Sequence, residues 1–237
     1  MNTTLFGVFG DESAFERFAT PEQYDLVLQG ERATVGVSDV GLGIPGRTTV
    51  HRGEHGCCLV WGEAYFEGDS KRRAAPLLYD AYRRRGPDAL SALNGSYLVY
   101  IEHEGDARVY TDAIRSWECY YTDAPGVRTF GTDAAQVART VTDPTRDWES
   151  VRQFAHFGNV FENQTFLEEL ERIPFDGYLG PDETGELRRF VYDPQEFDYV
   201  AELADRLERA LKRRTNLPGE TGLLLSAGYD SRIILSQ

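Results

Sequence analysis

The segment 96–112, SYLVYIEHEGDARVYTD, limits the fold of this 237-residue chain more than any other. Large side chains alternate along it, and Glu-Gly-Asp at 104–106 interrupts the alternation. A period of two around a short polar turn is typical of an antiparallel β-hairpin. The segment therefore predicts two neighbouring antiparallel strands in the middle of the chain.

Other short apolar runs repeat this signal on both sides of the hairpin. Further strands are predicted at Thr4–Gly10, Arg32–Ser38, Cys57–Tyr65, Trp117–Thr122 and Val127–Gly131, and a last hairpin at Gly177–Leu179 with Leu187–Tyr192. Apolar spacing and aspartate caps predict helices at Lys71–Arg85, Asp133–Arg139, Asp147–Phe157 and Phe161–Arg172. Many strands interrupted by a few helices indicate an α+β sandwich domain ending near residue 195.

The chain after residue 195 follows a different pattern. Phe197–Arg214 has the spacing of an amphipathic helix, and Gly222–Leu235 follows it as GLLLSAGYDSRIIL. The second stretch predicts a buried strand at Leu223–Leu225, a tight turn and the start of a helix. We therefore divide the chain into domains 1–195 and 196–237.

The turn in Gly222–Leu235 is a candidate anion site. Backbone N–H groups of such a turn and the following helix N-terminus converge on one point, which favours a phosphate. Its candidate residues are Ser226, Gly228, Asp230 and Ser231. An ordinary strand-to-helix turn is the alternative.

Charge and composition limit the partners and the compartment. The net charge of −14 and the pI near 4.7 disfavour nucleic acid. No apolar run has membrane-spanning length, and the N-terminus lacks the basic region of a signal peptide, so we expect a cytoplasmic protein. Lys71 and Lys212 are the lysines of this acidic chain, a composition that suits a salt-rich, halophilic cytoplasm. The cysteines and histidines lack zinc-site spacing, which favours free thiols.

Taken together, several motifs resemble glutamine-dependent asparagine synthetases. They are LFGVF at 5–9, GEAY at 62–65, LNGSY at 93–97, the segment Arg152–Leu179 and SAGYDS at 226–231. The resemblance implies a class II glutamine amidotransferase-like domain, a four-layer αββα sandwich of two antiparallel sheets with an N-terminal-nucleophile hydrolase-like fold. It also implies that the first strand and helix of a Rossmann-like, ATP-pyrophosphatase synthetase domain follow.

The resemblance also implies a reaction. In that family ATP adenylates a carboxylate such as that of aspartate, pyrophosphate leaves, and ammonia displaces AMP. Carried over, Ser226, Gly228, Asp230 and Ser231 would contact ATP phosphates, and Asp230 would assist Mg²⁺. The partners expected are a small-molecule carboxylate and an amine or ammonia, with no nucleic acid and no membrane, and the expected assembly is a homodimer.

The glutaminase half departs from the family pattern. Thr3 is in register with the family's N-terminal cysteine nucleophile, but methionine before Asn2 is not expected to be removed. Trp61 replaces the asparagine that helps form the oxyanion hole, next to Gly62 and Glu63, and Asp69 stands where the family holds the glutamine amino group. Losing one oxyanion donor costs roughly 100- to 1,000-fold in rate. We therefore predict that this half no longer hydrolyses glutamine.

Two alternatives to an ammonia-dependent amide ligase stay open. One is a ligase like β-lactam synthetase, and the other is a non-catalytic assembly or regulatory module. The family's carboxylate pocket and later ATP contacts would lie beyond Gln237, so we expect this chain alone to be inactive as a ligase. Leu223–Leu225 and Ile233–Leu235 would then form an exposed apolar patch.

Overall fold

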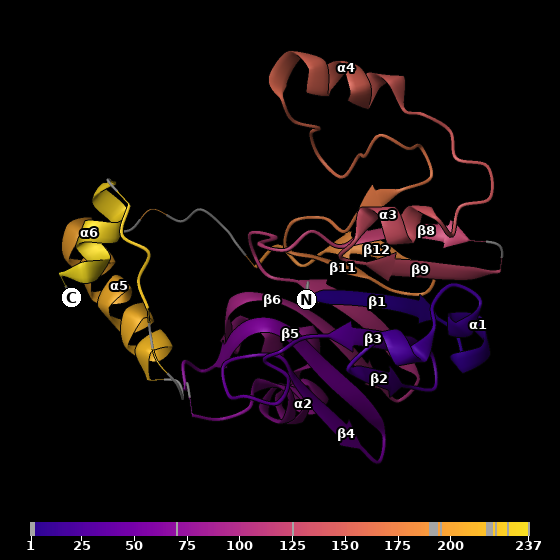
Figure 1. The fold of residues 1–237 in the computed structure, drawn as a ribbon. Helices are drawn as coiled ribbons and strands as arrows, with labels where there is room; N and C mark the ends of the chain where they lie inside the picture. The colour runs from indigo at the N-terminus through magenta and orange to yellow at the C-terminus, as the bar shows by residue number, and fades with distance from the viewer. Residues whose placement is uncertain are drawn as a thin grey trace.

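Two six-stranded sheets packed face to face form the body of the molecule (Figure 1). The computed structural model describes residues 3–69, 71–124, 126–189, 194, 196–216, 220, 222–226 and 228–236. Every strand pairing among them is antiparallel. The predicted α+β class and the two antiparallel sheets are confirmed.

The first sheet is built around the predicted hairpin. Its strands β6 (Leu93–His103) and β7 (Asp106–Thr111) pair from Leu98↔Thr111 to His103↔Asp106. Glu104 and Gly105 make the turn, both with positive φ. The sheet order is β12-β11-β7-β6-β5-β4, with β4 at Thr49–Gly53, β5 at Gly56–Phe66, β11 at Gly177–Leu179 and β12 at Thr184–Glu186.

The second sheet has the N-terminal strand near its centre. Its order is β10-β8-β9-β1-β3-β2, with β1 at Thr4–Phe9, β2 at Leu26–Gln29, β3 at Thr34–Ser38, β8 at Tyr120–Ala124, β9 at Val127–Gly131 and β10 at Glu171–Arg172. Strand β1 pairs with β3 on one side and β9 on the other, so the segment after Thr3 is fixed between two neighbours.

Helices cover the outer faces of both sheets. Helix α2 (Ala74–Arg85) packs on the first sheet, and α1 (Glu12–Glu16) and α3 (Ala134–Ala138) contribute to the core outside the second. Short 3₁₀ turns lie at Pro21–Gln23 and Gly86–Ala92. Helix α4 (Trp148–Phe157) stands above α3, away from the sheets (Figure 1). The order helix, sheet, sheet, helix is the four-layer arrangement expected from the sequence.

Strand β5 shows how one strand serves two cores. Cys57, Leu59 and Trp61 face the core between the sheets, whereas Cys58 and Val60 face the core under α2. Because successive side chains point to opposite faces, a strand buried on both sides is a continuous apolar run. The same period places Glu63 on the Trp61 side, in the second half of the strand. All three cysteines are free and buried, as predicted.

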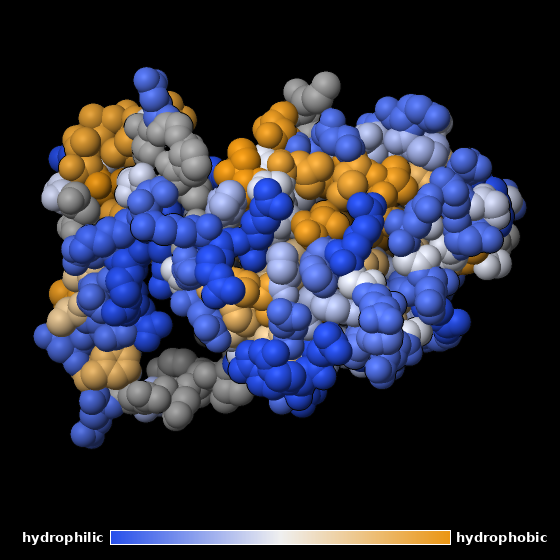
Figure 2. Space-filling model, turned by 90° about the horizontal axis from the view of Figure 1, so that it is seen from below, coloured by the Kyte–Doolittle hydropathy of each residue, from blue (hydrophilic) through white to orange (hydrophobic). Residues whose placement is uncertain are grey.

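Helices α5 (Tyr199–Thr215) and α6 (Tyr229–Leu235) lie to one side of the sandwich, which α5 meets through the arginines of its last turn (Figure 1). The predicted apolar face of α5 is exposed: Val200 is 79% accessible and Leu203 is 68% accessible. Figure 2 shows apolar side chains gathered at this end of the molecule, at the left of the view. The expected exposed apolar patch is confirmed, since Leu224 and Leu235 are also exposed.

Three sequence predictions were wrong in detail. The helix predicted at Phe161–Arg172 is absent, because the Thr165 hydroxyl donates to the Leu170 carbonyl at 2.7 Å and accepts from the Leu167 N–H at 3.1 Å. The second strand of the last hairpin is β12, just before the predicted Leu187–Tyr192, of which 190–192 lie outside the described residues. Strands β2 and β4 were not predicted, because both are short edge strands.

The strand predicted at Leu223–Leu225 is also absent. These residues have no neighbouring strand among the described residues. Leu223 instead lines an apolar cavity with Leu211, Ile234 and Leu235, between α5 and α6. An apolar run forms a buried strand only where a sheet receives it, and here Leu224 and Leu225 stay exposed. No helix in the described part of the chain is long and apolar enough to cross a membrane.

Candidate functional site

Trp61, which the resemblance assigns to the glutamine pocket, lies inside the sandwich. Its side chain is fully buried in the core between the sheets. The ring of Trp117 meets it edge-on, with centroids 5.0 Å apart and planes at 71°. Edge-to-face pairs of this kind add about 0.5–1.5 kcal/mol to the burial of the rings. Two indoles therefore pack together next to Gly62, in the middle of β5.

Trp117 also covers Gly62. Its Nε1 donates to the Ser96 carbonyl at 3.2 Å and lies 3.4 Å from the point where a Cβ on Gly62 would stand. Gly62 has φ +102°, and such a Cβ would lie 2.5 Å from the Ser96 carbonyl oxygen, so only glycine fits. The Gly62 N–H donates to the Thr48 hydroxyl at 2.9 Å. This N–H therefore stabilises the protein's own loop rather than an oxyanion.

Glu63 is engaged by arginines from two directions. Its carboxylate pairs with Arg214 at 2.6 Å and with Arg47 at 3.5 Å. Arg213 donates to the Asn94 Oδ1 at 3.3 Å. Two consecutive arginines from the last turn of α5 thus anchor that helix to the second half of β5 and to β6.

The structure separates the remaining residues of the predicted pocket. Thr3 is exposed and directly precedes β1, whose Thr4 pairs with Ser38. Asp69 is exposed in the turn after β5, where its Oδ1 accepts the Lys71 N–H at 2.8 Å. Trp61, Gly62 and Glu63 are consecutive on β5, so the strand itself brings them together.

Sequence reasoning missed how Trp117 is positioned. The buried Asp112 carboxylate accepts N–H groups from Tyr97, Ile114 and Ser116, each at 3.1 Å. These bonds fold 112–116 into a tight turn that ends with Trp117 beside Gly62. The available signal was a polar residue directly after a buried strand, followed four residues later by a serine and five residues later by a tryptophan.

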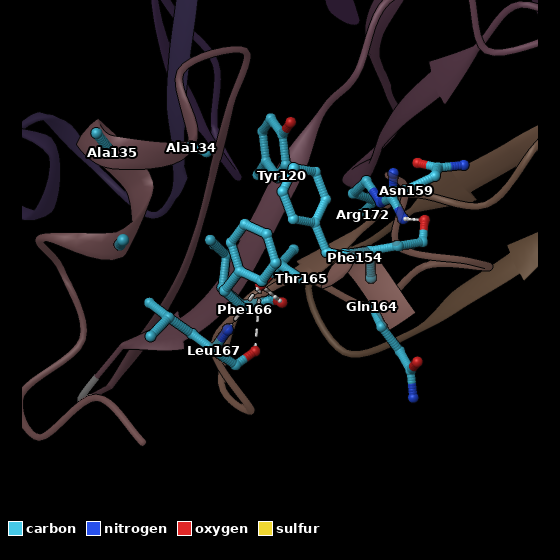
Figure 3. A pocket seen from close by; sticks show the side chains of 13 residues that line it. Tyr120, Ala134, Ala135, Phe154, Asn159, Gln164, Thr165, Phe166, Leu167 and Arg172 are labelled. Carbon is cyan, nitrogen blue, oxygen red and sulfur yellow. Dashed lines mark hydrogen bonds between the residues drawn. The ribbon is translucent and has the colours of Figure 1, made fainter. Parts of the chain in front are cut away.

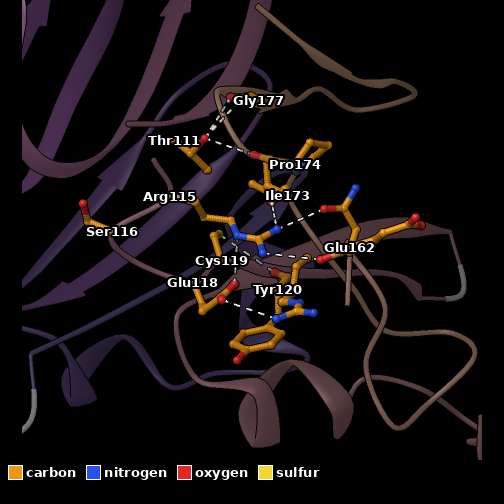
Figure 4. A network of polar contacts seen from close by, with 12 residues as sticks. Thr111, Arg115, Ser116, Glu118, Cys119, Tyr120, Glu162, Ile173, Pro174 and Gly177 are labelled. Atoms are coloured by element: carbon orange, nitrogen blue, oxygen red, sulfur yellow. Dashed lines mark hydrogen bonds and ion pairs between the residues drawn. The ribbon is translucent and has the colours of Figure 1, made fainter. Parts of the chain in front are cut away.

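A second polar network fixes the segment 158–173 against the sandwich (Figure 4). Arg115 donates to the Asn163 Oδ1 at 3.0 Å and to the Ile173 carbonyl at 3.2 Å. Glu118 lies between two guanidiniums, 3.3 Å from Arg115 and 3.4 Å from Arg172. Burial lowers the pKa of Arg115, although Glu118 opposes that shift. The network therefore holds the loop against the sandwich.

The predicted phosphate turn folds back on itself. The Ser231 hydroxyl lies 3.1 Å from the Ser226 hydroxyl and also donates to the Ser226 carbonyl. Gly228 is the N-cap of α6, and the Gly228 N–H donates to the Ser226 hydroxyl at 3.2 Å. Asp230 lies in the first turn of α6 and is exposed. The expected helix start is confirmed, but the serine hydroxyls are used within the turn.

A magnesium ion beside Asp230 would need ligands that the described residues of this turn do not supply. Among the described residues no three His, Cys, Asp or Glu side chains gather to hold a metal ion. Mg²⁺ is usually bound through one or two carboxylates together with substrate phosphates. The described residues of this turn offer Asp230 as their carboxylate.

Comparisons with known proteins give distant structural similarity. No protein-family model matches the sequence, and no curated protein matches it. Among solved structures, one described as the allosteric regulatory enzyme of purine biosynthesis is similar with a TM-score of 0.47 and 13% identity, over 79% of this chain and 50% of that one. Glutamine phosphoribosylpyrophosphate amidotransferase from B. subtilis, complexed with ADP and GMP, is similar with a TM-score of 0.42 and 11% identity, over 79% and 44%. This chain spans half or less of each.

Proposed function

We propose that residues 1–195 are a glutaminase-derived sandwich, N-terminal-nucleophile hydrolase-like in fold, that does not hydrolyse glutamine. We propose further that 196–237 begin the ATP-dependent half of an asparagine-synthetase-like ligase, which joins a small-molecule carboxylate to ammonia or an amine and releases AMP and pyrophosphate. The sandwich then acts as a structural module of that ligase.

The observation that carries the first part is the set of closed contacts around Trp61, Gly62 and Glu63 in the second half of β5. Trp61 and Trp117 pack together, the Gly62 N–H is bonded to Thr48, and Glu63 pairs with Arg214. A glutaminase needs free donors around an oxyanion and a free nucleophile. Here the indoles, the Gly62 N–H and the Glu63 carboxylate all make contacts within the protein instead. What supports the second part is the SAGYDS motif, with a tight turn opening α6.

ATP and Mg²⁺ belong to the proposed ligase half as a whole. Ser226, Gly228, Asp230 and Ser231 are its proposed phosphate contacts, with Asp230 beside the metal. Because the serine hydroxyls are bonded within the turn, they would have to turn outward to meet phosphate oxygens. When bound, ATP would supply the adenylyl group that activates the carboxylate, with pyrophosphate as the leaving group.

A thermal-shift measurement tests whether the sandwich binds glutamine. A ligand at 100 times its Kd stabilises a protein by about 2.7 kcal/mol, which for a domain of this size raises Tm by about 5–10 °C. We expect no shift with glutamine at any concentration up to its solubility. A saturable shift that Trp61→Ala alters would contradict the closed pocket.

Magnesium-dependent ATP–pyrophosphate exchange tests the ligase. The measurement is made on a protein that carries this sequence together with a complete synthetase half, with aspartate and other amino-acid carboxylates in turn. We expect exchange with one of them. No exchange with any carboxylate would leave the non-catalytic module as the function of the chain.

A further inference from the structure

A cavity of about 420 Å³ lies outside the second sheet, between α3 and the loop 158–173 (Figure 3). Alanines of α3 form one side of it, and three aromatic rings form another; these residues are Ala134, Ala135 and Ala138, and Tyr120, Phe154 and Phe166. An apolar cavity of about 150 Å³ holds one benzene ring. This cavity therefore has room for two fused rings with a short substituent, and its size is that of a small-molecule site.

The cavity is apolar at one end and polar at the other. In Figure 3 the labelled alanines lie on one side of the view and the Tyr120 and Phe166 rings in the middle, with Asn159, Gln164 and Arg172 on the opposite side. The amides of Asn159 and Gln164 can donate and accept hydrogen bonds. Of the described residues that line the cavity, Arg172 alone is charged. The lining therefore matches a molecule with an apolar body and one polar head.

The charges at the polar end favour an anionic head. Glu118 is shared by Arg115 and Arg172, so these three side chains carry one net positive charge. The Arg172 Nε is buried and has no hydrogen-bond partner among the described residues. Buried polar groups are nearly always paired, so this nitrogen indicates a place for an acceptor. One bound carboxylate would give two guanidiniums and two carboxylates, with no net charge.

The acidic side chains of the same loop lie outside the cavity lining. Glu162, Glu168 and Glu169 are not among the described residues that line the cavity. Glu162 and Glu168 are exposed, and physiological salt screens such charges beyond about 8 Å. Glu169 accepts the Thr145 N–H at 2.9 Å. The charged group that a ligand meets in the cavity is therefore the guanidinium of Arg172.

The walls of the cavity are held in place by contacts of their own. The Phe154 ring meets the Phe166 ring edge-on, with centroids 5.4 Å apart and planes at 89°. The Asp147 N–H donates to the Phe166 carbonyl at 3.0 Å, and Arg172 donates to the Val160 carbonyl at 2.8 Å. A site that is ordered before binding loses less conformational entropy when a ligand enters. The cavity is therefore a preformed site.

We propose that this cavity binds a small amphiphilic carboxylate, with its aromatic ring system against α3 and its carboxylate at Arg172. The site is separate from the Trp61 region, because Trp61 lies in the core between the sheets whereas Tyr120 and the α3 alanines border the core outside the second sheet. The proposal therefore does not depend on the proposed ligase function or on the loss of glutamine hydrolysis.

Isothermal titration calorimetry of the purified chain with three probes tests the proposal. The probe 2-naphthoate carries the rings and the carboxylate, 2-naphthamide keeps the rings without the charge, and acetate keeps the carboxylate alone. We expect 2-naphthoate to bind one site with a Kd of roughly 1 mM or below, as is usual for a ligand of its size. The amide should bind at least roughly 10-fold more weakly, the loss expected for one hydrogen bond to a charged group. Acetate should show no measurable binding.

Arg172→Gln tests the position of the carboxylate. It should weaken binding of 2-naphthoate by at least roughly 10-fold and leave binding of 2-naphthamide unchanged. A purely structural role of Arg172 would weaken both probes alike. Arg152→Gln is the matched control, since Arg152 is an exposed arginine of α4 outside the cavity lining, and it should change neither affinity.

Ala138→Leu tests the position of the rings. The larger side chain takes up part of the cavity and should weaken binding of both naphthyl probes by at least roughly 10-fold. Ala155→Leu, on α4 and outside the cavity lining, is the matched control and should leave both affinities unchanged. Circular dichroism shows whether each variant is folded, and Ala135→Leu, at an exposed position that also lines the cavity, replaces Ala138→Leu if that variant does not fold.

Three results would overturn the proposal. The first is no saturable binding of 2-naphthoate up to about 10 mM, well above the expected Kd. The second is equal affinity for 2-naphthoate and 2-naphthamide, which would remove the role of the carboxylate. The third is binding that neither Arg172→Gln nor the alanine-to-leucine variants of α3 weaken, which would place the ligand elsewhere on the protein.

Discussion

Replacing Trp61 by alanine tests whether this side chain is a structural part of the closed pocket. Trp61 is completely buried between the sheets. Burying about 250 Å² of a tryptophan at about 25 cal/mol/Å² gives about 6 kcal/mol as an upper limit. Alanine keeps the β-carbon, and the unfolded chain buries part of this surface already. We therefore expect Trp61→Ala to lower the free energy of unfolding by about 3–5 kcal/mol.

Urea denaturation followed by circular dichroism measures this loss. Trp61→Phe should lose less, because it removes an indole N–H that has no hydrogen-bond partner among the described residues. Trp148→Ala, at a 62% exposed position, is the matched control and should change stability by less than about 0.5 kcal/mol. A loss below about 1 kcal/mol for Trp61→Ala would show that the site between the sheets is not filled, and would refute the reasoning.

Three further outcomes follow from the polar contacts and the buried thiols. Glu118→Gln leaves two guanidiniums facing each other and should cost about 1–3 kcal/mol in urea denaturation, whereas Glu149→Gln, in an exposed pair, should cost less than about 1 kcal/mol. Arg214→Ala removes the ion pair with Glu63, so a protease should cut the chain before α5 faster than it cuts the unmodified chain. Because salt screens this ion pair, the unmodified chain should also be cut faster at high salt. Burial raises the pKa of the Cys57 thiol to about 12, above its value in the unfolded chain. The buried thiol therefore contributes its full stability below about pH 8.5, and this contribution is lost as the pH rises toward 12. A stability that stays constant between about pH 8.5 and pH 12 would contradict this.

The sandwich was predictable because its central strands carry strong local signals. The alternation of 96–112 and the two-faced run Cys57–Tyr65 each define a strand without reference to the rest of the chain. Aspartate caps located α3 and α4 correctly: the Asp133 and Asp147 side chains accept N–H groups of their first turns. Edge strands β2 and β4 were missed because a strand with one neighbour needs little apolar sequence.

The site was predictable only in its sequence positions. Replacement of the expected asparagine by Trp61 was visible, but its packing against Trp117 depends on a turn held by Asp112. The pairing of Glu63 with Arg214 joins residues 151 positions apart. A repeating sequence pattern does not predict contacts between residues so far apart, because such contacts depend on how the helices and strands pack. The exposed face of α5 likewise follows from packing, not from its amphipathic pattern.

Ammonia release from glutamine tests the central claim most directly. The purified chain is incubated with glutamine and the ammonia is measured by a coupled assay, alongside intact-mass analysis of the N-terminus and the Thr3→Ala variant. The account predicts release at the rate of buffer alone and no difference between the two proteins. Saturable release that Thr3→Ala abolishes, from a chain whose first residue is Thr3, would contradict it.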